Sequence, residues 1–351
     1  MNKRRNPTCP HCKNPWTVKR GSRNGCKRYS CQACHKCFTV DHHNKAIPLW
    51  IPHLDGISFR SLANVTGLSP AQIYRTVKKE MNALPENTWL TQKYCNRFCG
   101  ILIVDGKYVK VKGFKQKIPF IYGIDYLTHD IPVGILANSE NEEAFLKFFR
   151  LLKTCNYPLR VIVGDDRFPL GVAAEYHYQK VKSQLCQNHY VENIRQRLNV
   201  RTNPAYQHFF QFIYTYIFQG YKNTRQLYDN LHYLLKKQAK HDPLRQEIIV
   251  DIYKRRKELF QYASIEHCPK DTNLIELYNS HLQSRLKSIK GFKSFQAAER
   301  WLNAYLVRRR TKPLTDCDQK FKYLNGKCSL ERTLKRGGEW PEMPGIMKTK
   351  R

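Results

Sequence analysis

Acidic residues are scarce in this sequence. The 351 residues include 28 Asp and Glu against 61 Lys and Arg, which leaves a formal net charge of +33 at pH 7. A charge of this sign and size favours a polyanionic partner, because each phosphate neutralised by a basic side chain releases condensed counterions. Nucleic acid is the first candidate, and a basic surface without chemistry is the alternative. Since 41% of the residues are hydrophobic, a disordered basic tail is excluded as the whole account.

Long apolar runs are also lacking. No stretch approaches the ~18 uninterrupted apolar residues of a membrane span, and the first residues, MNKRRNPTCPHC, contain no apolar segment typical of a signal peptide. We therefore expect no secretion, no membrane partner and a cytoplasmic location. The chain has the length of two or three domains, because a single core stops growing near about 250 to 300 residues.

Cysteines are concentrated at the start of the sequence, where six of the thirteen fall within the first 37 residues. Cys9 and Cys12 form one C-x2-C pair, Cys31 and Cys34 form a second, and 18 residues separate the pairs. Two such pairs can present four thiolates to one Zn²⁺, and a module this poor in aliphatic residues needs such a ligand to fold. We predict a structural zinc module over residues 1–43. The alternative ligands are Cys26, Cys37, His11 and His35.

Residues 44–92 have helical spacing interrupted by glycine and proline. Gly67 supplies a left-handed turn, Ser69 caps the next helix, and Pro70 occupies its first position. This pattern predicts a helix-turn-helix that binds DNA, with an ordinary helical hairpin as the alternative. The second helix would expose four side chains to a major groove: Gln72, Tyr74, Arg75 and Lys78.

A β pattern begins at Ile101. The segments ILIVDGKYVKV, PFIYGIDY and IPVGILAN are rich in β-branched and aromatic residues, and they predict three consecutive strands of a meander. A helix over residues 140–152, the strand LRVIVGD and a helix near residues 169–179 follow, so the order is βββαβα. The segment KVKSQLC is a candidate fifth strand. The fold class is therefore α/β (α+β).

The remainder of the chain has helical patterns. Residues 188–265 predict helices throughout, and a final helical pair is expected at about Asn273–Ser288 and Ser294–Arg309. Residues 313–351, which end in KTKR, are expected to form a poorly ordered basic tail.

Two aspartates follow predicted strands. Asp105 comes after ILIV and Asp165 after LRVIVG, and in a βββαβ arrangement the first and fourth strands can be adjacent and parallel. Each aspartate alone has a second interpretation, because Asp after a strand is also a common cap or turn residue. Glu276, early in the segment TNLIELYNSHLQSRLK, is the candidate third acid, and an ordinary solvated helix face is its alternative.

Three clustered carboxylates suit two hard divalent cations, which promote in-line phosphoryl transfer. The expected ion is Mg²⁺, with Mn²⁺ as a substitute, since repulsion among the acids needs a metal to offset it. Asp166 is a rival to Asp165, and Asp125 and Glu299 are weaker rivals for other roles.

These motifs resemble the DDE transposases of bacterial and archaeal insertion sequences, nearest to the mutator-like group. In that group a C-x2-H motif follows the second Asp by some twenty residues, and here Cys186-Gln-Asn-His189 follows Asp165. The same group has a T-N-x-I-E stretch followed by G-F-x-S, and this chain has them at residues 272–276 and 291–294. Such families commonly have Gly directly after the second Asp, where this chain has Asp166, so the choice between Asp165 and Asp166 stays open.

The resemblance implies a ribonuclease-H-like catalytic core in two parts, residues 98–189 and 269–312, with an all-helical insertion at 190–268. An N-terminal zinc ribbon and helix-turn-helix would bind the terminal repeats of the element. Cys186 and His189 would support the site or the fold. Basic side chains expected on the DNA backbone are Lys107, Lys110, Lys112, Arg285 and Lys287.

The resulting hypothesis is a transposase that binds double-stranded DNA, cleaves element ends and transfers strands, working as a homodimer or higher oligomer at the nucleoid. A non-enzymatic DNA-binding regulator derived from a transposase is the alternative. A tyrosine recombinase is a weaker rival, because no constellation of Arg, His and Arg surrounds one tyrosine.

Overall fold

The computed structural model describes residues 6–23, 26–40, 47–166 and 168–346. Its chain divides into two compact units, Met1–Pro48 and Leu49–Arg351. None of the helices in the described residues is both long and apolar enough to span a bilayer.

The first unit is a small antiparallel sheet with the strand order β1-β2-β3. Tyr29 of β2 lies opposite Phe38 of β3, and their rings stack with centroids 5.9 Å apart. The buried side chains of the described part are Tyr29, Cys9, Cys31 and Thr17, and Phe38 is half-buried. The strands are β1 (Thr17–Arg23), β2 (Cys26–Cys31) and β3 (Cys37–Val40).

The second unit begins with four helices, and local capping explains the boundaries of two of them. The Ser58 side chain accepts a hydrogen bond at the start of α2, and Gly67 ends that helix in the left-handed region at φ 72°. Ser69 and Gln72 form a reciprocal capping box at the start of α3. The helices are α1 (Trp50–Leu54), α2 (Phe59–Thr66), α3 (Pro70–Asn82) and α4 (Asn87–Tyr94).

A mixed five-stranded sheet with the order β6-β5-β4-β7-β8 forms the centre of this unit. The predicted meander is confirmed, because β4, β5 and β6 are antiparallel neighbours. β7 is parallel to β4, with Ile103 opposite Val163, and β8 is parallel to β7. The strands are β4 (Ile101–Val109), β5 (Ile118–Asp125), β6 (Gly134–Leu136), β7 (Val161–Gly164) and β8 (Lys182–Leu185).

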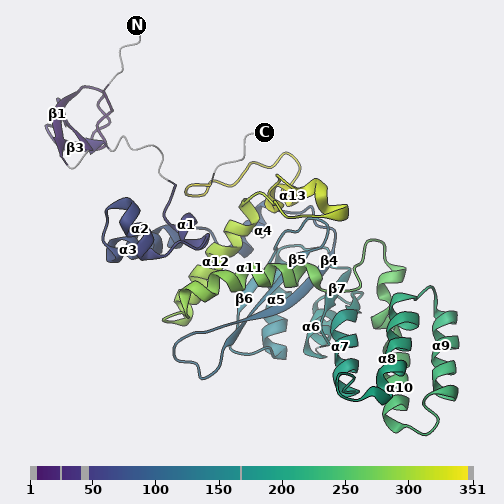
Figure 1. Ribbon diagram of the computed structural model, residues 1–351. Coiled ribbons are helices and arrows are strands. Elements are labelled where there is room, and N and C mark those ends of the chain that lie inside the picture. The colour runs from purple at the N-terminus through teal and green to yellow at the C-terminus, as the bar shows by residue number, and fades with distance from the viewer. Residues whose placement is uncertain (1–5, 24–25, 41–46, 167, 347–351) are drawn as a thin grey trace. The chain divides into compact units, whose positions relative to one another are not determined.

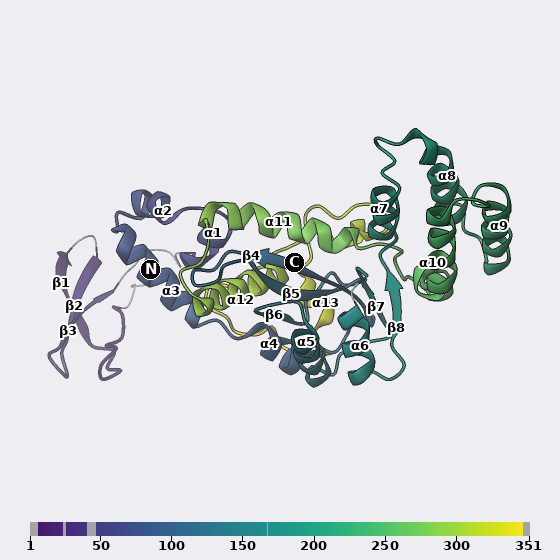
Figure 2. The same cartoon turned by 90° about the horizontal axis from the view of Figure 1, so that it is seen from below.

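Helices cover both faces of the sheet (Figures 1 and 2). Alternate residues of β4 belong to different cores: Ile101 and Ile103 pack with α11 and α12, whereas Leu102 and Val104 pack with α5 and α6. This alternation follows from the period of two along a strand. The covering helices are α5 (Glu142–Thr154), α6 (Phe168–His177), α11 (Asn273–Ile289) and α12 (Phe295–Thr311).

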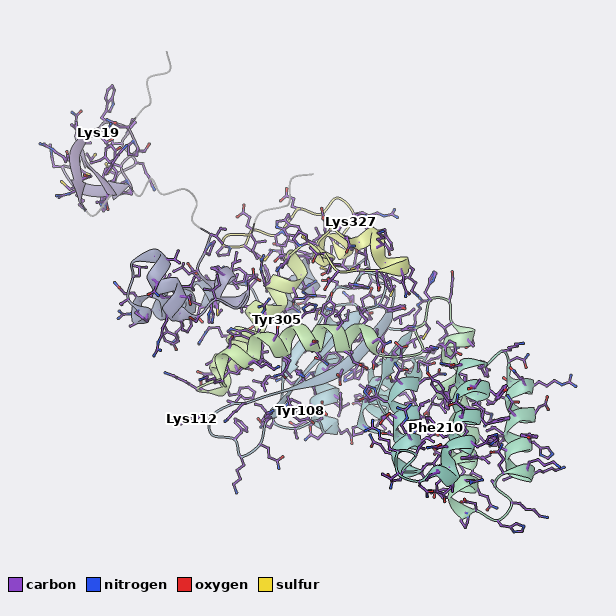
Figure 3. All side chains as sticks on the ribbon, in the orientation of Figure 1. Lys19, Tyr108, Lys112, Phe210, Tyr305 and Lys327 are labelled. Carbon is purple, nitrogen blue, oxygen red and sulfur yellow. The ribbon has the colours of Figure 1, made fainter. Side chains whose placement is uncertain are left out.

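Between β8 and α11 the chain forms a helical subdomain with its own apolar core. Phe210 lies within this core, among the helices at the right of Figure 3. The subdomain contains α7 (Gln187–Arg197), α8 (Gln207–Phe212), a π-helix (Ile213–Gln219), α9 (Thr224–Lys237) and α10 (Pro243–Leu259), with short 3-10 turns at Pro204–Tyr206 and Gln261–Ser264.

The C-terminal segment differs from the expected poorly ordered tail. Its described residues, up to 346, include a 3-10 helix (Gln319–Leu324) and α13 (Ser329–Thr333), and they bury Leu314, Leu324 and Leu330. The physical reason is a buried polar network, to which this segment contributes hydrogen-bond donors.

At the centre of that network Arg310 donates from Nη2 and Nε to the two carboxylate oxygens of Asp130, at 2.7 and 2.8 Å. Ser329 and Thr333 donate hydroxyl hydrogen bonds to the same carboxylate, at 3.0 and 2.5 Å. Because Arg310 and Asp130 are both 0% exposed, the ion pair depends on these partners to satisfy its hydrogen-bonding groups. The network therefore fixes the C-terminal segment to the core.

Replacing Asp130 by Asn leaves the Arg310 guanidinium buried without its counter-charge. We expect urea unfolding to show a loss of about 3 to 5 kcal/mol in the free energy of unfolding, which is typical when one partner of a buried pair is removed. Glu247→Gln is the control, because Glu247 pairs with Arg197 at the surface, where a pair contributes about 1 kcal/mol or less. Equal losses in the two variants would contradict the role of Asp130.

Candidate functional site

Asp105 and Asp165 lie on neighbouring parallel strands. The register pairs residue 103 with residue 163, so the same offset places position 105 beside position 165. A Cβ built on Gly164 would lie 3.4 Å from the carbonyl oxygen of Val104, so the two backbones remain close up to the end of β7. Continued past the last paired residues, this register puts both aspartates on the α11 side of the sheet where β7 ends.

The expectation that Asp105 ends its own strand was wrong. β4 continues to Val109, because its hairpin pairing with β5 extends from Leu102 opposite Asp125 to Val109 opposite Ile118. Asp105 instead lies two residues beyond the last parallel pair with β7, which joins Ile103 to Val163.

Helix α11 crosses this point and fixes the Asp105 carboxylate. Asn279 donates from Nδ2 to Oδ2 of Asp105 at 2.6 Å, and the Gly106 backbone N–H donates to Oδ1 at 2.7 Å. The amide of Asn279 is itself oriented by the Tyr122 hydroxyl, which donates to Asn279 Oδ1 at 2.8 Å. Glu276 precedes Asn279 by one helical turn, in the first turn of α11.

His189 links the other two acids. Its Nδ1 lies 2.7 Å from Oδ1 of Asp165, and its Nε2 lies 3.9 Å from Oε1 of Glu276. The Thr272 hydroxyl donates to Glu276 at 2.9 Å and lies 3.1 Å from the sulphur of Cys186. The C-x2-H residues, the second aspartate and the glutamate thus form one cluster.

The hydrogen bond to Asp165 raises the pKa of His189 to about 11, with a further contribution from the hydrogen bond to Cys186. The imidazole is therefore a cation at neutral pH and lies between two carboxylates. The negative charge of these carboxylates would also attract a metal cation to the same place. The acids keep access to solvent, with side chains 27% exposed for Asp165 and 46% for Glu276. Oxygen donors of this kind are the ligands that Mg²⁺ and Mn²⁺ prefer, so the chemistry of the cluster fits a divalent ion.

Asp166 has a different environment from Asp165. Both of its carboxylate oxygens accept hydrogen bonds from the Arg255 guanidinium of α10. This ion pair raises the pKa of Arg255 and attaches the helical subdomain to the end of β7. Asp166 is thus neutralised by a fixed cation, whereas Asp165 faces His189.

The other candidate acids lie apart from this cluster. Asp125 is fully buried and accepts hydrogen bonds from the backbone N–H of Cys99 at 2.9 Å and from the Tyr157 hydroxyl at 2.8 Å. These partners give it a structural role at the start of β4. Glu299 is exposed on α12.

Four residues of the site were missed by the sequence analysis: Thr272, Asn279, Glu140 and Arg255. Asn279 had a detectable signal, since it follows Glu276 by three residues and such a pair shares one helix face. Glu140 had none. Its carboxylate lies against Gly106, where a Cβ would be only 1.7 Å from Oε1, and its other oxygen accepts a hydrogen bond from Tyr108 at 2.9 Å.

The four cysteines of the first unit converge as the sequence predicted. All four Sγ atoms lie within 4.8 Å of one another, with Cys9 to Cys34 at 3.6 Å and Cys12 to Cys31 at 3.5 Å. Sulphur atoms 2.3 Å from a tetrahedral Zn²⁺ would be about 3.8 Å apart, so the cluster is compatible with zinc. Of the alternative ligands with described side chains, none joins the cluster: His11, His35 and Cys37.

Backbone N–H groups favour the thiolate form of Cys31, which is the form that binds zinc. The Cys34 and Ala33 N–H groups lie 3.5 and 3.4 Å from the sulphur of Cys31. Together they lower the pKa of Cys31 to about 6, against the burial that raises it. The thiolate, which is the zinc-binding form, therefore predominates at neutral pH.

Most of the side chains predicted to contact DNA are exposed, but Gln72 takes part in a helix cap and Arg285 is partly buried. Tyr74, Arg75 and Lys78 are exposed along α3, and Gln72 is exposed but forms the capping box of that helix. Lys287 is exposed on α11. Arg285 lies partly buried against Gly56, where a Cβ would be 2.6 Å from its Nη1.

Comparison with known families identifies the chain. A model of the family described as transposase, Mutator family, matches residues 56–312. The match covers well over half of the sequence and includes Asp105, Asp165 and Glu276, and the chain belongs to this family of transposases. A search of curated proteins found no match.

The cysteine cluster predicts one zinc ion per chain. Elemental analysis of the purified protein should find about one equivalent, and Cys31→Ser should reduce it to near zero because three thiolates bind a structural zinc far more weakly. Cys37→Ser is the matched control and should retain the metal. Equal zinc contents in both variants would contradict the assignment.

The His189–Asp165 hydrogen bond predicts an unusual titration in the metal-free protein. Because the folded pKa is raised to about 11, the imidazole signal in NMR spectra should not titrate between pH 5 and 8. In Asp165→Asn it should return toward the ordinary value of about 6.5. The contribution of this pair to stability is complete below about pH 6.5 and is lost as the pH rises toward about 11. A wild-type signal titrating near its ordinary value would contradict the pairing.

Proposed function

We propose that this Mutator-family transposase is a DDE enzyme in which Asp105, Asp165 and Glu276 hold two Mg²⁺ or Mn²⁺ ions. The observation that carries the proposal is the parallel register of β4 and β7, which sets Asp105 beside Asp165 beneath the helix that carries Glu276. The ions would activate water or a DNA 3′-hydroxyl and stabilise the leaving oxygen during in-line phosphoryl transfer. The products would be cleaved element ends and then transferred strands.

The fold supports a ribonuclease-H-like core. Three antiparallel strands are followed by two parallel ones, helices cover both faces, and the acids lie at the β4–β7 junction. We assign residues 98–189 and 269–312 to this core and residues 190–268 to a helical insertion. The separate apolar core of the insertion supports that division.

Asp165 is the second metal ligand in this proposal, and Asp166 is not. The bidentate Arg255 pair neutralises Asp166 and occupies both of its oxygens. Among the described residues, the Asp165 carboxylate pairs with His189, whose ring could turn away when a divalent ion binds. A divalent cation that binds Asp165 would therefore break fewer existing interactions than one that binds Asp166.

Asn279, Thr272, Cys186 and His189 are positioning residues. Asn279 holds the Asp105 carboxylate at a fixed rotation, and Thr272 holds Glu276. His189 lies between Asp165 and Glu276 and would keep these two carboxylates near each other. This arrangement limits the rearrangement needed when the ions bind.

The N-terminal modules would bind the ends of the element. We propose a zinc ribbon over residues 1–43 and a helix-turn-helix over 44–92, with α3 as the recognition helix. The exposed Tyr74, Arg75 and Lys78 support this role for α3, and Lys107, Lys110, Lys112, Arg285 and Lys287 would contact the DNA backbone. Joining two ends requires a homodimer or a higher oligomer on double-stranded DNA, and the place of action is the nucleoid.

The proposal predicts a defined loss of activity. With linear DNA that carries the element's flanking ends, cleavage should require Mg²⁺ or Mn²⁺ and should stop with EDTA. Asp105→Asn, Asp165→Asn and Glu276→Gln should each lower the rate at least about 1,000-fold, while the affinity for the ends in Ca²⁺ changes less than about threefold.

Asp166→Asn is the matched control, because it alters the neighbouring carboxylate and should keep most of the cleavage activity. Full activity in Asp165→Asn with loss in Asp166→Asn would reverse the assignment of the second ligand. Tight binding to the ends without cleavage in any metal would favour the regulator instead.

A further inference from the structure

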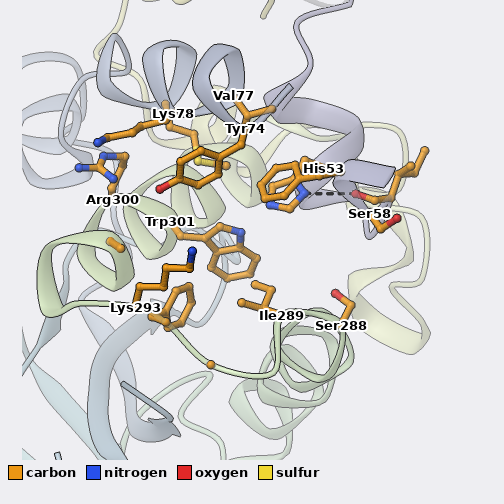
Figure 4. Close-up of a pocket in the computed structure, with 16 residues that line it drawn as sticks. His53, Ser58, Tyr74, Val77, Lys78, Ser288, Ile289, Lys293, Arg300 and Trp301 are labelled. Carbon is orange, nitrogen blue, oxygen red and sulfur yellow. Dashed lines mark hydrogen bonds between the residues drawn. The ribbon is translucent and has the colours of Figure 1, made fainter. Parts of the chain in front are cut away.

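A hollow of about 300 Å³ lies between α3 and the segment that joins α11 to α12, outside the acidic cluster. It is shown in Figure 4. Its size is that of a small-molecule site. The metal chemistry does not account for it, and the hollow shares only Tyr74 and Lys78 with the proposed groove contacts of α3.

Two aromatic walls enclose the hollow. On one side His53 stacks on Phe59 with ring centroids 4.2 Å apart, and Tyr74 meets the edge of Phe59 at 5.6 Å. On the other side Phe292 and Trp301 lie 5.7 Å apart. Flat aromatic surfaces of this kind accept a planar ring between them, and base-on-aromatic stacking is a main source of affinity for unpaired nucleotides.

A hydrogen-bond donor in the wall has no partner. Trp301 is only 5% exposed, and its Nε1 forms no hydrogen bond with any described residue. Figure 4 shows this nitrogen on the side of the indole that faces Tyr74 and His53 across the hollow. A buried donor without an acceptor costs free energy, so a ligand acceptor that reached Nε1 after a shift of the neighbouring side chains would be favoured there.

The charged side chains around the hollow are all basic: Lys78, Lys293 and Arg300. No ion pair with a described residue involves Lys78 or Lys293, and both are exposed. A phosphate attached to the ring would therefore find uncommitted cations at the rim, whereas an acidic side chain is absent from the lining described here. This charge distribution favours a nucleotide over a neutral apolar ligand.

We propose that this hollow binds one unstacked base of the DNA substrate, held between Tyr74 and Trp301. The proposal rests on the proposed function, since it deepens how the transposase engages DNA near its ends. Glu276 and Ile289, which lies at the hollow, are 13 positions apart on α11, a distance of about 20 Å along the helix axis. A base extruded here would fix the position of the DNA relative to both the recognition helix and the acids.

The test compares two labelled DNAs of identical sequence, one fully paired and one with a two-thymine bulge, bound to the full chain in Ca²⁺. The wild type should bind the bulged DNA at least about fivefold more tightly, and Tyr74→Ala should remove that preference. Tyr74→Phe should preserve it, and Trp301→Phe should weaken it by about threefold to tenfold because the Nε1 donor and part of the stacking surface are lost. Tyr176→Ala is the control, since Tyr176 is 76% exposed on α6.

A photocrosslink supplies a second readout. With 5-iodouracil in the bulge, mass spectrometry should find the crosslink on the peptide of Tyr74 or Trp301. Crosslinks elsewhere, or the same bulge preference in Tyr74→Ala as in the wild type, would overturn the proposal. A change of oligomeric mass in Tyr74→Ala without a change in bulge preference would also overturn it, in favour of a contact with a second copy of the chain.

Cleavage of paired element ends in Mg²⁺, measured on the same preparations, separates the two proposals. Metal-dependent cleavage without a bulge preference refutes the base site and leaves the DDE function standing. A bulge preference that needs Tyr74, without cleavage, refutes the DDE function and supports the base site.

Discussion

The parallel pairing of β4 with β7 is the constraint on which the rest of the structure depends. Three residue pairs, from Ile101–Val161 to Ile103–Val163, set the register, and a slip by one residue would turn the following aspartates to opposite faces of the sheet. Between these strands the chain forms the hairpin partners of β4 and then α5, which packs on the face opposite α11. The relative placement of the acids therefore depends on both layers of helices that pack against the central sheet.

Electrostatics imposes a second requirement on this arrangement. Clustered carboxylates repel one another, and within a chain of net charge +33 each has acquired a specific cationic or neutral donor. Arg255 forms an ion pair with Asp166, His189 pairs with Asp165, and the amide of Asn279 donates a hydrogen bond to Asp105. The partners differ in kind, because Asp166 has a bidentate guanidinium, Asp165 has one imidazole nitrogen, and Asp105 accepts from the Asn279 amide and the Gly106 backbone N–H. That difference is what separates a structural aspartate from a candidate metal ligand.

Much of this organisation could be predicted from the sequence. Runs of β-branched residues indicated the strands, and Ser69, Pro70 and Gly67 indicated the boundaries of α2 and α3, because these signals are local. The C-x2-C spacing predicted the cysteine cluster for the same reason. The strand order also predicted that the strands before Asp105 and Asp165 are parallel neighbours, and β4 and β7 are paired in this way.

The remaining features depend on contacts between distant parts of the chain. The ordered C-terminal segment results from the Asp130–Arg310 pair and its partners Ser329 and Thr333, and nothing near those residues signals it. The extension of β4 to Val109 depends on its pairing with Ile118. Likewise, only the fold shows that Glu140 lies against Gly106 and that Arg255 reaches Asp166.

The central claim is that Asp105, Asp165 and Glu276 form one binding site for divalent ions. A crystal soaked in Mn²⁺ and measured at the manganese absorption edge tests it most directly. The account predicts anomalous peaks bounded by these three carboxylates, with the His189 ring displaced from Asp165. Peaks on Asp166 instead, or no peak near Asp105 while the protein is bound to cleavable DNA, would contradict it.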